Sequence, residues 1–170
     1  FEAYQKEDES PVTSADYRAN DIIMKILEEQ TPDIPVMSEE TEQLPLAERE
    51  KWTRYWLIDP IDGTQEFIAR SGDFAVNIAL IEHNRPVIGV IYWPAGETLY
   101  FASISQGAYK RCNVETKKIA VRAFCVPSED VIMIAISRRQ SREKVFERMS
   151  EKRVYQTLPA GSCSLKACFI

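Results

Sequence analysis

The chain has 170 residues and a net charge of -5, and 45% of its residues are hydrophobic. These values are typical of a folded globular protein and exclude an intrinsically disordered chain. The acidic balance and the lack of a basic stripe argue against a nucleic-acid partner, and no run of 18 apolar residues predicts a transmembrane segment. The single histidine, His83, lies in a predicted turn, which disfavours Ser-His or Cys-His nucleophilic catalysis.

The first predicted element is a long amphipathic helix that begins just after Thr13. Its apolar positions recur at helical spacing: Ala15, Ala19, Ile22, Ile23 and Ile26. Thr13 is a natural N-cap, and Asp16 follows three positions later, as in a capping box. Capping alone is therefore a sufficient explanation for Asp16 at this point.

A cluster of acidic residues follows the extended stretch over residues 34–37, at Ser38-Glu39-Glu40-Thr41-Glu42. One interpretation is a solvated run of charge in a loop, with Ser38 capping a short helix. The other is that Glu39 is a metal ligand, because it comes at the end of an apolar segment. The cluster alone does not decide between the two.

The most informative segment is Asp59-Pro60-Ile61-Asp62-Gly63-Thr64, which follows an apolar run over residues 55–58. That run predicts a buried strand, which Pro60 should end. Asp59, Asp62 and the Ile61 carbonyl provide the oxygen ligands that Mg²⁺ prefers. Gly63 leaves room for a phosphate group at the start of a helix through residue 68.

Asp, Pro and Gly are also the usual residues of tight turns, so a simple turn is the alternative interpretation of this segment. A hairpin fits poorly, because no matching strand begins directly after Thr64. In the functional interpretation, Asp16 and the Thr64 hydroxyl together orient and deprotonate a metal-bound water for attack on phosphorus. Asp16 can act both as a cap and in this chemistry.

Beyond this segment the pattern predicts a mostly antiparallel sheet. The strand-like runs cover residues 74–81, 87–93, 99–102 and 119–121. The clearest hairpin turn is His83-Asn84-Arg85-Pro86. The pattern then changes to strand 131–136, helix 141–149, strand 154–157 and a helix from about residue 162.

The change of pattern near residues 125–130 predicts two domains in a layered arrangement of helices and sheets, an α+β or α/β sandwich. We expect an N-terminal α+β domain over residues 1–127 that carries the metal and phosphate motifs. Residues 128–170 are then the start of a C-terminal α/β domain, and the site lies between the two parts.

The three motifs, in this order, resemble the lithium-sensitive, magnesium-dependent phosphatases of the inositol monophosphatase superfamily. That pattern is a Thr-x-x-Asp, a Glu-Glu pair and Asp-Pro-x-Asp-Gly-Thr, found here at 13–16, 39–40 and 59–64. Glu66 and the Gly161-Ser162-Cys163-Ser164-Leu165-Lys166 segment resemble the 3'(2'),5'-bisphosphate nucleotidase branch in particular. The resemblance covers essentially the whole chain and implies the inositol monophosphatase-like, or sugar phosphatase, fold.

The resemblance also implies roles for individual residues. The metal ligands would be Glu39, Asp59, Asp62 and the Ile61 carbonyl, holding two or three Mg²⁺ ions. Asp16 and Thr64 would activate water. The substrate would be held by Glu39, Gly63, Thr64, Ser164 and Lys166, although Lys166 is equally explained as a surface lysine of a helix.

Two departures from the family pattern stand out. Gln140 follows Ser137-Arg138-Arg139 where members of the branch often have a histidine that contributes to nucleotide binding. The Trp-Asp pair that supplies the family's last metal carboxylate is absent, since none of the three tryptophans precedes an aspartate. We expect that ligand beyond Ile170, in a chain that is truncated at its C-terminus.

The implied activity is Mg²⁺-dependent hydrolysis of the 3'-phosphate of adenosine 3',5'-bisphosphate, with the sulfated nucleotide as a further substrate, in sulfur metabolism. Two alternatives stay open: an inositol monophosphatase or broader sugar phosphatase, and a non-catalytic fragment that binds nucleotide or metal. We expect a cytoplasmic protein, with peripheral attachment to the inner face of the membrane as an open alternative. The oligomeric state is not predicted.

Overall fold

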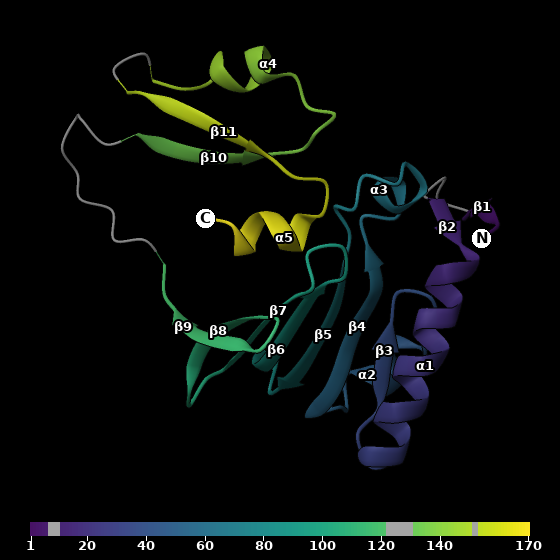
Figure 1. Ribbon diagram of the computed structural model, residues 1–170. Coiled ribbons are helices and arrows are strands. Elements are labelled where there is room, and N and C mark those ends of the chain that lie inside the picture. Colours follow the sequence, from purple (N-terminus) through teal and green to yellow (C-terminus); the bar gives the residue numbers. More distant parts are fainter. Residues whose placement is uncertain (7–10, 122–130, 151–152) are drawn as a thin grey trace.

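The computed structural model describes residues 1–6, 11–121, 131–150 and 153–170, and its largest element is a seven-stranded sheet (Figure 1). The strands lie side by side in chain order. The first pair is parallel and every later pair is antiparallel. The strands are β3 (Val36–Ser38), β4 (Arg54–Asp62), β5 (Ala75–Glu82), β6 (Arg85–Trp93), β7 (Thr98–Ser103), β8 (Gly107–Cys112) and β9 (Glu115–Ile119).

The mostly antiparallel sheet is as the sequence predicts, and β5, β6 and β7 match three predicted strands. The prediction misses β8 and is wrong about the last strand, because β9 ends at Ile119, where that strand was expected to begin. Both β8 and β9 are mostly exposed and rich in Lys and Arg. An exposed edge of a sheet has little apolar alternation from which to recognise it.

The turn between β5 and β6 confirms the predicted hairpin. β5 ends at Glu82 and β6 begins at Arg85, so His83 and Asn84 form a two-residue loop. Both have positive φ, 47° and 61°. A two-residue loop with this backbone matches the right-handed twist of the strands that it joins.

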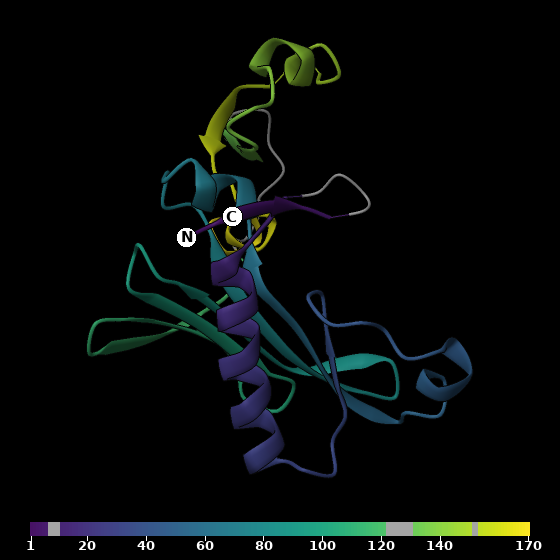
Figure 2. The same cartoon turned by 90° about the vertical axis from the view of Figure 1, so that its right-hand side faces the viewer.

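The first helix, α1 (Ser14–Gln30), begins where the sequence predicts. Thr13 is its N-cap and forms a capping box with Asp16. Figure 2 shows α1 lying along the sheet, and its contacts there are with β3 and β4. The helix therefore carries Asp16 to the end of the sheet where β3 and β4 end.

The predicted apolar face of α1 is wrong in part. Ile22 and Ile26 are exposed, whereas Asp16 and Asn20 are buried. A polar contact explains the burial of Asn20, because the Ser38 hydroxyl donates a buried hydrogen bond of 2.6 Å to Asn20 Oδ1. This contact turns the Asn20 side of α1 toward the sheet.

Three short elements are not evident from the sequence. β1 (Ala3–Gln5) pairs with β2 (Pro11–Thr13) in a separate antiparallel ladder, and α2 (Leu46–Arg49) is a single turn between β3 and β4. Elements of three or four residues are too short to show a hydrophobic period.

β4 is longer than predicted. Pro60 does not end the strand, which continues to Asp62 with an irregular register between Asp59 and Asp62. Proline cannot donate to a ladder and is tolerated in strands at such bulges. The irregularity leaves Asp59 paired with Asn77 and Asp62 paired with Ala75.

The C-terminal part alternates strand and helix, as predicted. β10 (Ile132–Ile136) and β11 (Tyr155–Pro159) form a parallel pair, with α4 (Arg142–Phe146) in the connection. The last helix, α5 (Cys163–Cys168), contacts β10 on one side and β5 and β6 on the other. It lies between the large sheet and the small one (Figure 1).

The predicted domain boundary near residues 125–130 lies outside the described residues, so the division at residue 127 stays a prediction. Within the described ranges, no helix is long and apolar enough to cross a membrane.

Candidate active site

The parallel pair of β3 and β4 brings two acidic motifs to one edge of the sheet. Ser38 at the end of β3 is paired with Ile58 in β4, and the Glu39 amide donates to the Ile58 carbonyl at 3.2 Å. Glu39 and Asp59 are the next residues along their strands. Parallel strands end on the same side, so both carboxylates lie at the same edge.

Asp59 lies in a strongly acidic environment. Burial, followed by the charges of Glu39 and Asp62, raises its pKa to about 7, against the opposing effect of a hydrogen bond from the Ile61 amide. A carboxyl group behaves this way when it is desolvated next to other carboxylates. A cluster of hard oxygen donors that repel one another fits a divalent cation such as Mg²⁺.

Lys6 lies against the acidic pair after β3. Its ammonium group is 3.2 Å from Glu39 Oε1 and 2.8 Å from Glu40 Oε1. Burial raises the pKa of Glu40 even with Lys6 beside it. The contact of Lys6 with the acidic pair spans more than 30 positions and is not predictable from its neighbours in the sequence.

Asp62 is held by the start of α5. Its Oδ2 accepts hydrogen bonds from Ser162 Oγ at 2.6 Å, from Ser164 Oγ at 2.6 Å and from the Ser164 amide at 2.8 Å. Burial alone would raise the pKa of Asp62, but these hydrogen bonds outweigh it and hold the pKa below its usual range. The hydrogen bonds from the start of α5 thus favour the ionised form of Asp62.

Asp16 and Thr64 meet as predicted, although 48 positions separate them. The Thr64 hydroxyl lies 3.2 Å from Asp16 Oδ1 and 3.2 Å from the Ile61 carbonyl. The other oxygen of Asp16 accepts from the amide of Thr13 at 2.9 Å and from its hydroxyl at 2.5 Å. Asp16 is almost fully buried. It therefore caps α1 and contacts Thr64 at the same time.

In the described part of the chain, no three His, Cys, Asp or Glu side chains converge as ligands around one point. The side chains explain this: Glu39 is paired with Lys6, and Asp62 faces the two serines. Asp59 has Glu39 and Asp62 as its charged neighbours. The metal-ligand assignments remain proposals.

Ser164 and Lys166 lie on α5 at different places. Ser164 contacts Asp62 in the first turn, and Lys166 follows two residues later and is half-buried. Ser162, which is fully buried, was not singled out by the sequence. The signal that could have indicated it is its position before α5, where serine is a preferred N-cap.

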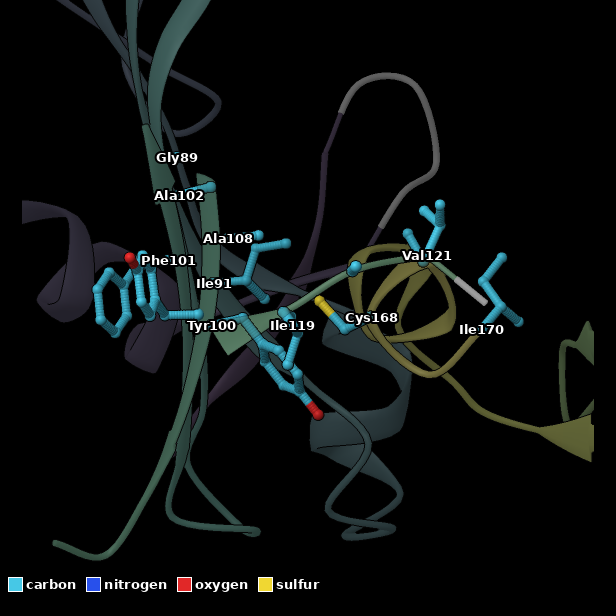
Figure 3. A pocket seen from close by; sticks show the side chains of 13 residues that line it. Gly89, Ile91, Tyr100, Phe101, Ala102, Ala108, Ile119, Val121, Cys168 and Ile170 are labelled. Atoms are coloured by element: carbon cyan, nitrogen blue, oxygen red, sulfur yellow. The ribbon is translucent and has the colours of Figure 1, made fainter. Parts of the chain in front are cut away.

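A hollow beside α5 lies away from this cluster. It has a volume of about 290 Å³ and lies between the large sheet and the C-terminal end of α5 (Figure 3). Tyr100, Ile119 and Cys168 are among its lining residues, and no acidic or basic side chain lines it. It is not where the predicted ligands meet.

The backbone at Gly63 makes a testable prediction. Gly63 is the N-cap of α3 (Thr64–Ile68), with φ of 96°, and an added Cβ would lie 3.0 Å from the Asp73 carbonyl oxygen. Gly63→Ala is therefore expected to lower the free energy of unfolding by about 1–3 kcal/mol. Denaturant unfolding measures this. Gly89→Ala is the control, because nothing lies within 4 Å of its Cβ position; equal effects of the two changes would contradict the account.

The acidic environment of Asp59 predicts a pH dependence for the metal-free protein. A folded-state pKa near 7, above the ordinary 3.8, means that the folded state holds this proton more tightly than the unfolded state. Its stabilising contribution is complete below the unfolded pKa and is lost as pH rises through about 7. The pKa of Asp62 is lowered, so ionised Asp62 stabilises the folded state. That stabilisation is lost only as the pH falls to more acidic values.

With a chelator present, we therefore expect a melting temperature about 3 °C higher at about pH 5.5 than at about pH 8. Asp59→Asn should reduce this difference, because the residue no longer titrates. Thermal melts of both proteins at the two pH values provide the measurement. A wild-type protein that is more stable at the higher pH would show that Asp59 is not destabilised by its neighbours.

Comparison with known proteins agrees with this fold. The model of the inositol monophosphatase family matches residues 2–170. The 3'(2'),5'-bisphosphate nucleotidase CysQ of Salmonella typhimurium is 44% identical over the whole chain, which spans 66% of that relative's length.

Two solved structures share the fold. CysQ from Bacteroides thetaiotaomicron has a TM-score of 0.75 and 33% identity, with 97% of this chain and 65% of that one covered. The Thermotoga maritima IMPase has a TM-score of 0.79 and 26% identity, with coverages of 100% and 63%. The predicted fold class is confirmed. Since the family model covers nearly every residue, the chain belongs to the inositol monophosphatase family.

Proposed function

We propose that this protein is a 3'(2'),5'-bisphosphate nucleotidase that hydrolyses the 3'-phosphate of adenosine 3',5'-bisphosphate to AMP and phosphate. The sulfated analogue, in which a phosphosulfate replaces the 5'-phosphate, is a second proposed substrate. The identity to CysQ supports the choice of substrate. The observation that carries the chemistry is the half-buried Asp59, with Glu39 and Asp62 as its charged neighbours.

Glu39, Asp59, Asp62 and the Ile61 carbonyl are the proposed ligands of two or three Mg²⁺ ions. Mg²⁺ would neutralise the phosphate oxygens and stabilise the leaving oxygen. The residues fit this role because all of them offer hard oxygen donors at one edge of the sheet. Lys6, which pairs with Glu39 and Glu40, would have to give up part of that contact.

The proposed catalytic pair is Asp16 and Thr64. Asp16 Oδ1 accepts a hydrogen bond from the Thr64 hydroxyl, so the lone pairs of Thr64 Oγ are free to accept a hydrogen bond from the attacking water. The water oxygen forms a bond to phosphorus and passes one proton through the Thr64 hydroxyl to Asp16, the bond from phosphorus to the ribose 3' oxygen breaks, and that oxygen takes up a proton from solvent, to which Asp16 later returns its own. Asp16 is anchored by Thr13, which keeps the acceptor in place during proton transfer.

Substrate contacts follow from the same geometry. Gly63 and Thr64 are proposed to hold the phosphate at the start of α3, with Glu39 nearby. Ser164 and Lys166 on α5 are proposed to contact the nucleotide. These two come from the C-terminal part of the chain, so the substrate would lie between that part and the large sheet.

Comparing two substrates tests the proposal. Because the chain spans about two thirds of its curated relatives, the assay uses the chain itself and a chimera in which the Salmonella relative supplies the remaining length. Phosphate release from adenosine 3',5'-bisphosphate should exceed release from inositol 1-phosphate by about tenfold or more in kcat/KM. Faster turnover of inositol phosphate would favour an inositol monophosphatase, and binding without turnover in the chimera would favour a non-catalytic module.

A further inference from the structure

Two further carboxylates lie outside the acidic cluster, and both face the C-terminal part of the chain. Asp73 precedes β5, and Glu66 lies on α3; the side chain of each is 9% exposed. Asp73 Oδ2 is 2.5 Å from Arg138 Nε, and Glu66 Oε1 is 3.5 Å from Arg139 Nε. The two arginines follow β10. The pairs therefore join the large sheet to the small one.

The backbone of Gly161 packs directly on both carboxylate side chains. Its amide donates to Asp73 Oδ2 at 2.9 Å. A Cβ at this position would lie 2.2 Å from Glu66 Cγ and 2.9 Å from Asp73 Cβ. Only glycine allows so close an approach, so the position of the β11–α5 connection is set by these two side chains.

The residues that follow Gly161 hold Asp62. Ser162 is fully buried, caps α5 through the Leu165 amide and donates to Asp62 Oδ2. Ser164 donates twice to the same oxygen. One peptide bond thus separates the Asp73–Gly161 contact from the Ser162–Asp62 contact. A shift of the connection at Gly161 would carry the serine donors with it.

We propose that Asp73 is a positioning residue for the active site. It fixes the connection at Gly161 so that the serines hold Oδ2 of Asp62, which leaves Oδ1 the less occupied oxygen and the one available to a cation. This inference rests on the metal-binding role proposed for Asp62. Figure 1 shows the geometry: the connection from β11 to α5 descends beside α3 at the end of the large sheet.

A purely structural ion pair is the competing explanation. Arg138 is 46% exposed, and an ion pair with so exposed a partner contributes little to stability. A structural pair would change the free energy of unfolding and leave the metal site unchanged. A positioning residue would change local order at Gly161 and Ser164, and metal affinity, more than it changes overall stability.

The test combines two measurements on four variants. Amide hydrogen exchange at Gly161 and Ser164 is measured with a chelator present, and the Mn²⁺ dissociation constant is measured by electron paramagnetic resonance. In Asp73→Ala, both amides should exchange about tenfold faster and the dissociation constant should rise about tenfold. Asp73→Asn and Arg138→Gln should show smaller changes, because Asn keeps an acceptor for Gly161 and Arg138→Gln leaves Asp73 in place.

Glu82→Gln is the matched control, since Glu82 pairs with Arg54 at the other end of β5. Exchange and affinity should stay within about twofold of the wild type. Unchanged exchange and affinity in Asp73→Asn and Arg138→Gln, together with changes in Asp73→Ala no larger than in the control, would overturn the inference. A wild-type protein that binds no Mn²⁺ would overturn the metal role of Asp62, and the exchange rates would still decide whether Asp73 positions the connection.

Discussion

Replacing Asp59 with Asn is expected to lower Mg²⁺-dependent phosphate release by roughly a thousandfold or more. The negative charges of Glu39 and Asp62 both act on Asp59. An asparagine amide provides neither the charge nor the two equivalent oxygens with which Asp59 would bind a cation. The same change should stabilise the metal-free protein at about pH 8, because it removes one of three mutually repelling charges. Loss of activity together with a gain in stability is an unusual combination.

The assay measures phosphate release by the chimera, and melting curves with a chelator measure stability. Asp21→Asn is the control: Asp21 is exposed on α1, so the change removes one charge away from the cluster. It should leave turnover within about twofold of the wild type. Near-normal turnover in Asp59→Asn would remove Asp59 from the metal site.

The second large effect is expected at the pair of Asp16 and Thr64. Asp16→Asn and Thr64→Val should each lower kcat by about 10²–10⁴, because both are needed to orient the attacking water. The kcat of the double variant should be no lower than that of the less active single variant, since the two residues act as one unit. Thr64→Ser keeps the hydroxyl and should retain most of the activity.

Stability separates the two functions of Asp16. Asp16→Asn weakens the capping box and should cost about 0.5–2 kcal/mol, whereas Thr64→Val leaves that cap intact. Thr13→Val removes the cap hydroxyl and should lower stability with a much smaller loss of kcat. Additive losses in the Asp16 and Thr64 double variant, measured in the same phosphate-release assay, would contradict joint action.

Local patterns in the sequence are enough to predict some elements. The start of α1 is encoded within one turn by Thr13 and Asp16, and the β5–β6 hairpin by His83 and Asn84, which tolerate positive φ. The joint action of Asp16 and Thr64 is a functional interpretation of their two motifs that the family resemblance also implies, and the structure brings the two side chains together.

Other features depend on contacts between distant parts of the chain. Asp62 takes its hydrogen bonds from serines about 100 positions away, and Lys6 reaches Glu39 and Glu40 across the fold. A buried hydrogen bond to Asn20 determines which side of α1 faces the sheet and which side is exposed. The helical spacing of apolar residues does not reveal this contact. These contacts depend on how the sheet is assembled, so no local pattern predicts them.

The most direct test of the metal site is anomalous X-ray diffraction from crystals of the protein soaked in Mn²⁺. A peak is expected at the edge where β3 and β4 end, within about 2.5 Å of Asp59 and the Ile61 carbonyl oxygen, with Glu39 turned away from Lys6 toward it. Asp59→Asn crystals should lack this peak. Strong Mn²⁺ peaks elsewhere, with none beside Asp59 in a protein that releases phosphate, would contradict the account.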